Sequence, residues 1–436
     1  MNTQNDYAIR RQNLMQQMQP ESVAVIFAAP EILRNGDTHY PYRQNSDFYY
    51  LTGFKEPNAV AVLIPNRAEG SYVLFTQPRD PSREIWDGAR VGPEGACKFL
   101  GANQAFTIDE LDELLPQLLY HHKHLYCCFG RDAILEPRLG NCLNRIRAKY
   151  LPAGAAPTTL IDLATALHEM RLIKSETEIA LMRTAAQISA AAHLRAMQIC
   201  RPGLKEYQVE AEMRHVLLNG GCSELAYTSI VAAGKNACTL HYVDNAAELN
   251  SGDLLLVDVG GEHQYYAADI TRTFPINGRF STEQRAIYEL VLKAQLAGID
   301  AAQPGYSWIA AQEVMVPIIT QGLINLGILQ GSVAENIEKR SYQRFYMHNS
   351  GHWLGLDVHD SGAYKVADQW RMLQIGMVLT VEPGIYIAAE SAGVDPRWWN
   401  IGVRIEDDIL ITAEGNEVLS AAAPKTVAEI EATMGK

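Results

Sequence analysis

The sequence predicts an α/β domain followed by an α+β domain, and three observations support this division. The chain has 436 residues, too many for a single core. About the first 160–170 residues alternate strand-like apolar runs with helical patterns, whereas the second part reads helix, helix, hairpin, helix, helix and strands. Between these parts, Ser175 and Glu178 form a capping box that opens a long helix. We therefore expect domains over residues 1–172 and 173–436.

In the first domain, Asp6 is expected to cap an opening helix that Pro20 closes. Strands are expected at Val23–Ala28, Phe48–Leu51, Val60–Ile64, Val73–Phe75 and Leu125–Phe129. Helices are expected at Asp109–Leu119 and Pro137–Lys149. The stretch Pro152–Leu160, with two prolines and several small residues, is interpreted as a linker.

In the second domain, helices with one apolar face alternate with strands. The predicted helices run from Ser175 toward Cys200, from Lys205, after Ser281, and from Ser307 to Leu326. The predicted strands are Ser229–Ala232, two arms within residues 254–274, Leu379–Ile387 and Ile401–Thr412.

Composition excludes several classes of protein. The net charge of -13 argues against nucleic acid as a partner. The first residues are polar, with no apolar signal core, and no uninterrupted apolar stretch reaches the ~18 residues that span a bilayer. The seven cysteines are irregularly spaced, which is typical of reduced thiols. We therefore expect a cytoplasmic protein without a membrane partner.

A hairpin predicted over residues 254–274 carries two acidic residues in apolar surroundings. Its arms, Leu254–Val259 and Ala267–Phe274, flank a short polar turn that begins with two glycines. Each arm contains one aspartate, Asp258 and Asp269. Facing residues of a hairpin come within about 5 Å, and two such carboxylates repel each other unless a cation lies between them. We therefore interpret this hairpin as half of a metal site.

Two later strands repeat the pattern. Leu379–Ile387 and Ile401–Thr412 are apolar, and each contains one glutamate, Glu382 and Glu406. Two hairpins that each donate two carboxylates indicate a duplicated α+β unit around a central curved sheet. This inference rests on layout, because the sequence contains no matching repeat.

Three histidines precede the second pair of strands: His348, His352 and His359. Interleaved glycines disfavour a helix here. On a regular strand, His348 and His352 share a face and His359 points the other way. We therefore expect one direct metal ligand among them, whereas the others need a bulge or a loop to reach the site.

These residues together predict a centre for two divalent cations. The candidate ligands are Asp258, Asp269, His352, Glu382 and Glu406. Their oxygen-rich set favours Mn²⁺, Mg²⁺ or Fe²⁺, although Co²⁺ or a catalytic Zn²⁺ pair also fits. Two such ions can hold a hydroxide and polarise a carbonyl, which is hydrolytic chemistry. An amide is favoured over a phosphate because only Arg272 and Arg404 lie near these motifs as possible phosphate clamps.

These motifs resemble those of the pita-bread metallopeptidases, which include methionine aminopeptidase, prolidase and aminopeptidase P. The matching motifs are the two aspartates eleven residues apart, a Gly-His with a downstream histidine, Glu382-Pro-Gly and Arg404-Ile-Glu-Asp. Further motifs resemble bacterial aminopeptidase P: Tyr40–Phe54 followed by Glu56-Pro57, Glu84–Trp86 and His168–Leu172. The resemblance spans nearly the whole chain. It implies an N-terminal domain of the creatinase/aminopeptidase P type over 1–172 and a pita-bread catalytic domain over 173–436.

The resemblance implies a dinuclear-metal aminopeptidase that hydrolyses the N-terminal Xaa-Pro bond of peptides with a metal-bridging hydroxide. The resemblance favours Mn²⁺ as the metal, and it implies that the five candidate ligands bind the two ions. Catalytic roles are implied for Glu382 as proton shuttle and for His241, His348, His359, Tyr386 and Arg404. Among these, His241, His348 and His359 also match residues that contact substrate. A homodimer or homotetramer is implied as well.

One motif departs from the family pattern. Where the family usually has His-Gly, this chain has His348-Asn349. Asparagine tolerates a positive φ less well than glycine, so the position of His348 is in question although the ligands are intact.

Three alternatives remain. A prolidase shares the metal residues, and the first-domain motifs favour aminopeptidase P over it. A non-catalytic pita-bread binding protein and a metal-free creatinase-like amidinohydrolase are disfavoured because all five ligands are present.

Overall fold

The computed structural model describes residues 4–129, 135–149 and 156–435. The chain separates into two compact units, Met1–Arg171 and Leu172–Lys436. Each unit has its own core. No helix within these described ranges is both long and apolar enough to cross a membrane.

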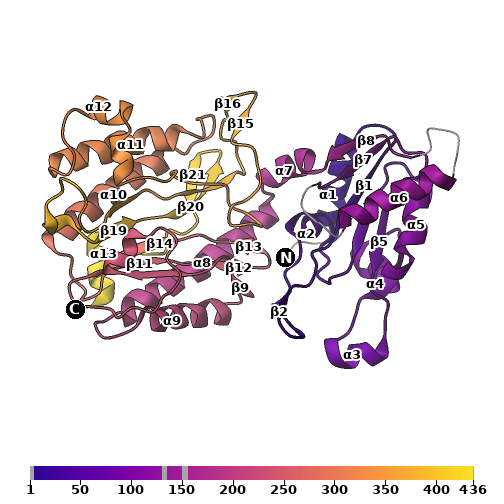
Figure 1. Cartoon of the computed structure of the whole chain (residues 1–436), viewed down its shortest axis with the longest axis horizontal. Coiled ribbons are helices and arrows are strands. Elements are labelled where there is room, and N and C mark those ends of the chain that lie inside the picture. The colour runs from indigo at the N-terminus through magenta and orange to yellow at the C-terminus, as the bar shows by residue number, and fades with distance from the viewer. Residues whose placement is uncertain (1–3, 130–134, 150–155, 436) are drawn as a thin grey trace. The chain divides into compact units, whose positions relative to one another are not determined.

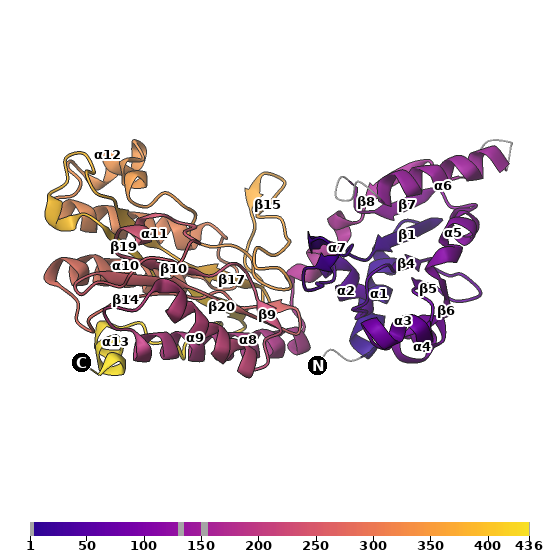
Figure 2. The same cartoon turned by 60° about the horizontal axis from the view of Figure 1, so that its bottom comes forward.

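The first unit is built on a six-stranded mixed sheet in the order β6-β5-β4-β1-β7-β8 (Figures 1 and 2). Its strands are β1 Ser22–Phe27, β4 Val60–Leu63, β5 Tyr72–Thr76, β6 Gln104–Thr107, β7 His124–Cys127 and β8 Thr159–Asp162. The pairs β1–β7, β5–β6 and β7–β8 are parallel, and β1–β4 and β4–β5 are antiparallel. A small hairpin, β2 Leu33–Asn35 and β3 Thr38–His39, lies outside this sheet.

Helices cover both faces of this sheet. They are α1 Gln4–Gln17, α2 Ser46–Thr52, α3 Pro81–Asp87, α4 Gly92–Leu100, α5 Leu111–Leu119, α6 Leu135–Lys149 and α7 Ala164–Leu172, with a short 3₁₀ turn η1 Ile108–Glu110. Helices α1 and α2 lie on one side and α5 and α6 on the other (Figure 2). This arrangement confirms the predicted α/β class of the first domain.

Two predictions for the first unit are wrong. Phe48–Leu51 is not a strand but part of helix α2, whose residues are all buried and therefore show no polar face. The Asn45 side chain caps this helix, and Gly53 ends it in the left-handed conformation (φ 65°). The predicted linker Pro152–Leu160 lies partly outside the described residues, and its last two residues begin strand β8.

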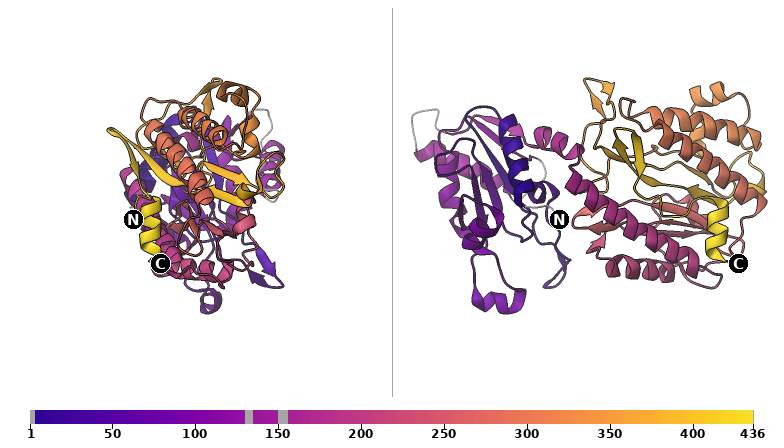
Figure 3. Two further views of the ribbon diagram at one scale, coloured as in Figure 1. Left: turned by 90° about the vertical axis from the view of Figure 1, so that its left-hand side faces the viewer. Right: turned by 180° about the vertical axis from the view of Figure 1, so that it is seen from behind.

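The second unit places its strands between two helix pairs, α8–α9 and α10–α11 (Figures 1 and 3). Its helices are α8 Glu176–Ile199, α9 Glu206–Asn219, α10 Thr282–Ala301, α11 Ala310–Asn325, α12 Val333–Glu338 and α13 Val427–Met434, with 3₁₀ turns η2 Gly234–Cys238, η3 Ser341–Arg344 and η4 Pro396–Trp398. The predicted capping box is confirmed, because Ser175 and Glu178 each accept a hydrogen bond from the other's backbone N–H. These elements confirm the predicted α+β class.

The strands of the second unit form short antiparallel groups. They are β9 Glu224–Leu225, β10 Ile230–Ala233, β11 Leu254–Asp258, β12 Gly261–His263, β13 Tyr266–Ala267, β14 Thr271–Pro275, β15 Lys365–Val366, β16 Gln369–Trp370, β17 Val378–Val381, β18 Gly384–Ile387, β19 Ile401–Arg404, β20 Asp407–Thr412 and β21 Gly415–Val418. The groups that carry the predicted site are β10-β11-β14, β17-β20-β21 and β18-β19.

The predicted hairpin over 254–274 exists, but its turn differs from the prediction. Strands β11 and β14 pair antiparallel, with Asp258 opposite Thr271. Between them, the chain does not turn directly at the two glycines but forms a second small hairpin, β12–β13, in another sheet. Its two-residue turn is Gln264-Tyr265, both at positive φ. Neither residue favours that conformation, so neither residue type marks this turn.

The later strand pair is broken at the position of each glutamate. Strands β17 and β18 are separated at Glu382, and β19 and β20 at Glu406. Strand β17 pairs with β20 and β18 with β19, so the two breaks lie opposite each other. The Glu382 N–H donates instead to the Ser350 carbonyl (2.9 Å), and the Glu406 N–H to the Thr271 carbonyl (3.1 Å).

Candidate metal centre

A cavity of about 650 Å³ lies in the second unit and brings together nearly all the predicted site residues. The candidate ligands Asp258, Asp269, His352, Glu382 and Glu406 line it, together with His241, His348, His359 and Arg404. Tyr386 is buried and is hydrogen-bonded to two of these lining residues, His348 and Arg404. Their roles as ligands or catalysts stay predictions.

One tyrosine joins the two aspartates. Asp258 is the last residue of β11 and Asp269 lies two residues before β14. The Tyr227 hydroxyl oxygen lies 2.6 Å from Oδ1 of each carboxylate, and both aspartates are buried. A hydroxyl has one hydrogen to donate, so two contacts this short need a second proton or a cation at the pair.

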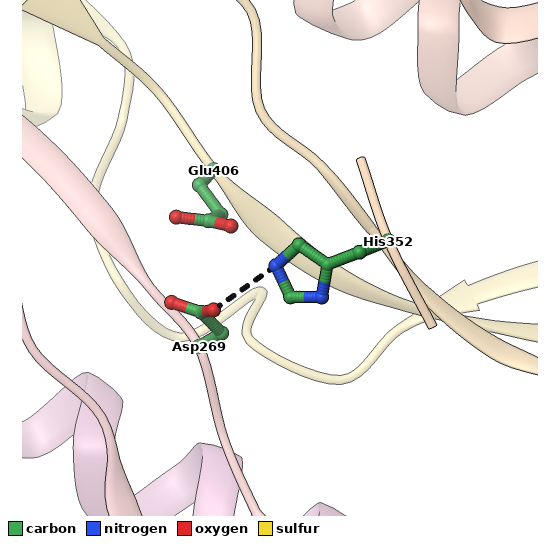
Figure 4. Close-up of side chains that lie close together, drawn as sticks. All are labelled: Asp269, His352 and Glu406. Atoms are coloured by element: carbon green, nitrogen blue, oxygen red, sulfur yellow. Dashed lines mark ion pairs between the residues drawn. The ribbon is translucent and has the colours of Figure 1, made fainter. Parts of the chain in front are cut away.

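Asp269, His352 and Glu406 converge on one point. Each offers a ligand atom, and these atoms lie within 4.8 Å of one another. Figure 4 shows the two carboxylates and the imidazole facing a shared space. His352 Nε2 lies 3.3 Å from Asp269 Oδ2, and the Glu406 carboxylate accepts a hydrogen bond from the Thr271 hydroxyl (2.7 Å). Such a set of oxygen and nitrogen donors suits a divalent cation.

Glu382 borders the same group. Its Oε1 lies 3.7 Å from His352 Nε2, and its Oε2 lies 3.7 Å from His348 Nδ1. The backbone break at Glu382 turns this side chain toward the cavity that it lines. Glu382 is therefore placed both beside the converging ligands and beside a second histidine.

A hydrogen-bond chain leads from the aspartates to His348. The Arg404 guanidinium donates to Asp258 Oδ2 (2.6 Å) and to the Tyr386 hydroxyl (3.0 Å). The Tyr386 hydroxyl lies 2.9 Å from His348 Nε2, and the other ring nitrogen of His348 lies 2.8 Å from the Asn349 carbonyl. Because a carbonyl only accepts, Nδ1 carries the hydrogen and the Tyr386 hydroxyl donates to Nε2 of the neutral ring. Both ring nitrogens of His348 are thereby engaged.

The histidine motif is not a strand. Residues 347–362 make a single β-bridge, at Trp353, so the alternation of faces expected for a strand does not apply. The loop between them places the His359 ring against the His352 ring, with the ring centroids 4.3 Å apart. Asn349 is exposed on the cavity lining and does not adopt a positive φ. The substitution of Asn349 for the family glycine therefore imposes no such backbone strain here.

The carboxylates of this cluster are buried close to one another, so their charged forms are unfavourable without added positive charge. Burial raises the pKa of Glu382 to about 7, and it also raises the pKa of Asp258 and of Glu406, with neighbouring carboxylates adding to each shift. Burial disfavours the charged form of His352, but the hydrogen bond and charge of Asp269 outweigh it and raise the pKa of His352 to about 9. The cluster therefore tends to bind protons, which neutralise its carboxylates. Divalent cations suit the same site because their positive charge also neutralises these carboxylates.

This shift predicts how pH affects the metal-free chain. The pKa of Glu382 rises from an ordinary value of 4.5 to about 7. The raised pKa contributes about 3 kcal/mol to the free energy of unfolding of the metal-free chain. This contribution is fully present below pH 4.5 and is lost as the pH rises through 7. Urea unfolding of chelator-treated protein between about pH 6.5 and 8 should show the free energy of unfolding falling, because the lowered pKa values of His348 and His193 oppose this effect only below pH 6.5. A free energy that rises over this range would contradict the assignment.

Sequence reasoning missed two residues of the site. Tyr227, which joins the aspartates, precedes strand β10, and Thr271, which donates a hydrogen bond to Glu406, lies in a buried strand. A lone tyrosine or threonine near a strand is common. Only the pairing of distant segments reveals what they contact.

Buried carboxylates and a histidine in an α+β domain define a metal-dependent hydrolytic site, and comparison with known proteins identifies the family. The family model described as metallopeptidase family M24 matches residues 180–413. The model described as aminopeptidase P, N-terminal domain, matches residues 7–126. The chain belongs to metallopeptidase family M24.

Relatives match along the whole chain. The Xaa-Pro aminopeptidase of Escherichia coli (strain K12) is 46% identical over 433 residues, which are 99% of this chain and 98% of that protein. The structure of Pseudomonas aeruginosa aminopeptidase PepP matches with a TM-score of 0.98 and 52% identity, over 99% of this chain and 98% of that one. The structure of E. coli aminopeptidase P with the inhibitor Pro-Leu matches with a TM-score of 0.96 and 46% identity, over the same shares. These matches confirm the predicted fold, including the pita-bread catalytic domain, and the prediction of a hydrolase.

Proposed function

We propose that this chain is an aminopeptidase that hydrolyses the first peptide bond of peptides with proline in the second position. The observation that carries the proposal is the convergence of Asp269, His352 and Glu406 in one cavity. Full-length similarity to Xaa-Pro aminopeptidases supports the substrate class.

In this proposal, two divalent cations, with Mn²⁺ favoured, are held by Asp258, Asp269, His352, Glu382 and Glu406. When bound, the cations supply Lewis acidity at the scissile carbonyl and lower the pKa of water. The fit rests on the donors described above, which are mainly carboxylate oxygens.

The chain's own residues then supply binding and proton transfer. Glu382 has a pKa of about 7 without metal, and it is the carboxylate that borders both His352 and His348, so we assign it the proton shuttle. His241 and His359 are exposed on the cavity lining, where they can contact the peptide. Arg404 and Tyr386 hold His348 in a fixed tautomer.

This chemistry suits proline. The bond before proline is a tertiary amide without an N–H, so an enzyme that must grip that hydrogen fails on it. Apolar and aromatic residues also line the cavity and provide surface for a proline ring; these include Leu240, Val243, Trp308, Tyr364 and Trp370.

The test compares two peptides with chelator-treated protein to which Mn²⁺ is returned. We expect Mn²⁺-dependent release of arginine from Arg-Pro-Pro and little cleavage of an Xaa-Pro dipeptide. Chromatography of the products measures both reactions. Preference for the dipeptide would instead support a prolidase. Loss of activity on both, with metal bound, would support a non-catalytic role.

We further propose the setting of this activity. The domains are 1–172 and 173–436, and the protein is a cytoplasmic homodimer or homotetramer. All seven cysteines are free thiols, which supports a reducing compartment.

A further inference from the structure

A buried ion pair lies at the histidine-bearing loop and includes none of the converging ligands. Lys174 Nζ lies 3.0 Å from Asp360 Oδ2, and each side chain is 1% exposed. Both residues belong to the second unit. Taking two charges out of water is costly, and an apolar pair of similar volume is often as stable, so stability alone explains this pair poorly.

The pair is tied into the loop that follows Trp353. The Asp360 N–H donates to the Trp353 carbonyl (2.9 Å), and Asp360 Oδ1 lies 3.4 Å from the Asp357 N–H. On the opposite side, the Lys174 N–H donates to the Gly376 carbonyl (2.8 Å). The ion pair therefore connects the start of the second unit to the loop.

Gly355 leaves room for these two side chains. A Cβ at this position would lie 2.2 Å from Asp360 Oδ2 and 3.0 Å from Lys174 Cε. The Gly355 carbonyl also accepts a hydrogen bond from the Ala267 N–H (2.9 Å), two residues before Asp269. The loop is thus packed against both the ion pair and the metal-site hairpin.

His359 depends on this loop for its position. It immediately precedes Asp360, and its ring meets the His352 ring edge-on at 4.3 Å. Within the described part of the chain, no hydrogen bond to the His359 ring is found, and the side chain is exposed on the cavity. The backbone and the ring contact with His352, rather than a hydrogen bond, therefore set where His359 points.

We propose that Lys174 and Asp360 are positioning residues that hold His359 at the peptide cavity. This inference rests on the proposed function, because it requires His359 to act on a bound peptide. The ion pair acts through His359 alone and contacts neither substrate nor cation.

The test is a double-mutant cycle with the full chain, Mn²⁺ and Arg-Pro-Pro. Lys174→Met should lower kcat about 100-fold, as expected for a misplaced catalytic side chain, and change KM less than about threefold. His359→Ala should lower kcat by at least as much. The Lys174→Met/His359→Ala variant should be no slower than His359→Ala, because the positioned side chain is already absent. Multiplied losses in kcat would overturn the proposal.

Further variants separate positioning from folding. Lys174→Met/Asp360→Leu leaves no unpaired buried charge, so its melting temperature should stay near that of the wild type while kcat remains low. Gly355→Ala, which displaces Asp360, should lower kcat like Lys174→Met. Lys205→Met is the matched control, since Lys205 forms an exposed ion pair with Glu248, and its kcat should not change.

The outcomes distinguish this inference from the proposed function. A wild-type chain inactive on Arg-Pro-Pro would remove the proposed function and this inference with it. An active wild type whose Lys174→Met/Asp360→Leu variant has normal kcat would overturn the inference and leave the proposed function standing.

Discussion

Glu382→Ala is expected to lower kcat for Arg-Pro-Pro by about 10³-fold or more while leaving the fold intact. General acid–base catalysis alone contributes about 10²–10⁴-fold, and Glu382 is also a candidate metal ligand. The fold should persist because the mutation removes one carboxylate from a crowded acidic cluster whose pKa values are already raised. Steady-state kinetics and far-UV circular dichroism measure the two effects.

The control for this variant is Glu414→Ala, because Glu414 is an exposed glutamate of the same unit. It should have wild-type kinetics. If Glu382→Ala kept normal kcat with metal bound, the assignment of the proton shuttle would be wrong, and so would the hydrolytic mechanism built on it.

Metal removal is expected to abolish hydrolysis and to lower the melting temperature. Without cations, the buried carboxylates around Tyr227 repel one another, so a cation that binds only the folded chain stabilises it. At a free metal concentration about 1,000 times Kd, this stabilisation is about 4 kcal/mol. Calorimetry of chelator-treated protein, before and after return of Mn²⁺, measures the effect.

Asp269→Asn provides the matched variant for this experiment. It removes a charge from the point where Asp269, His352 and Glu406 converge, and it should therefore reduce the metal-dependent rise in melting temperature. An unchanged rise would place the metal elsewhere in the chain.

The sequence predicts the candidate site better than the path of the chain around it. Carboxylates in apolar strands are chemically unusual, so Asp258, Asp269, Glu382 and Glu406 could be found without knowing which segments pair. These four carboxylates and His352 line the same cavity. The strand break at Glu382 had a signal in Pro383-Gly384, because proline cannot donate to a strand ladder. The break at Glu406 had none, because no glycine or proline lies beside it.

Three other differences arise because local patterns do not encode tertiary packing. Helix α2 is buried all round, so its apolar run is indistinguishable from that of a strand. The turn at Gln264-Tyr265 uses residues that seldom adopt a positive φ, and tertiary packing overrides their preference. Tyr227 and the Lys174–Asp360 pair depend on contacts between distant segments, which local patterns do not encode.

The opposed breaks at Glu382 and Glu406 also bear on how the chain folds. The candidate ligands come from segments between residues 258 and 406, and the two glutamates face the hairpin only after β17 has paired with β20 and β18 with β19. Such long-range pairings form slowly. A cation therefore has no complete binding site early in folding. Its binding should lower the rate of unfolding and leave the rate of folding nearly unchanged.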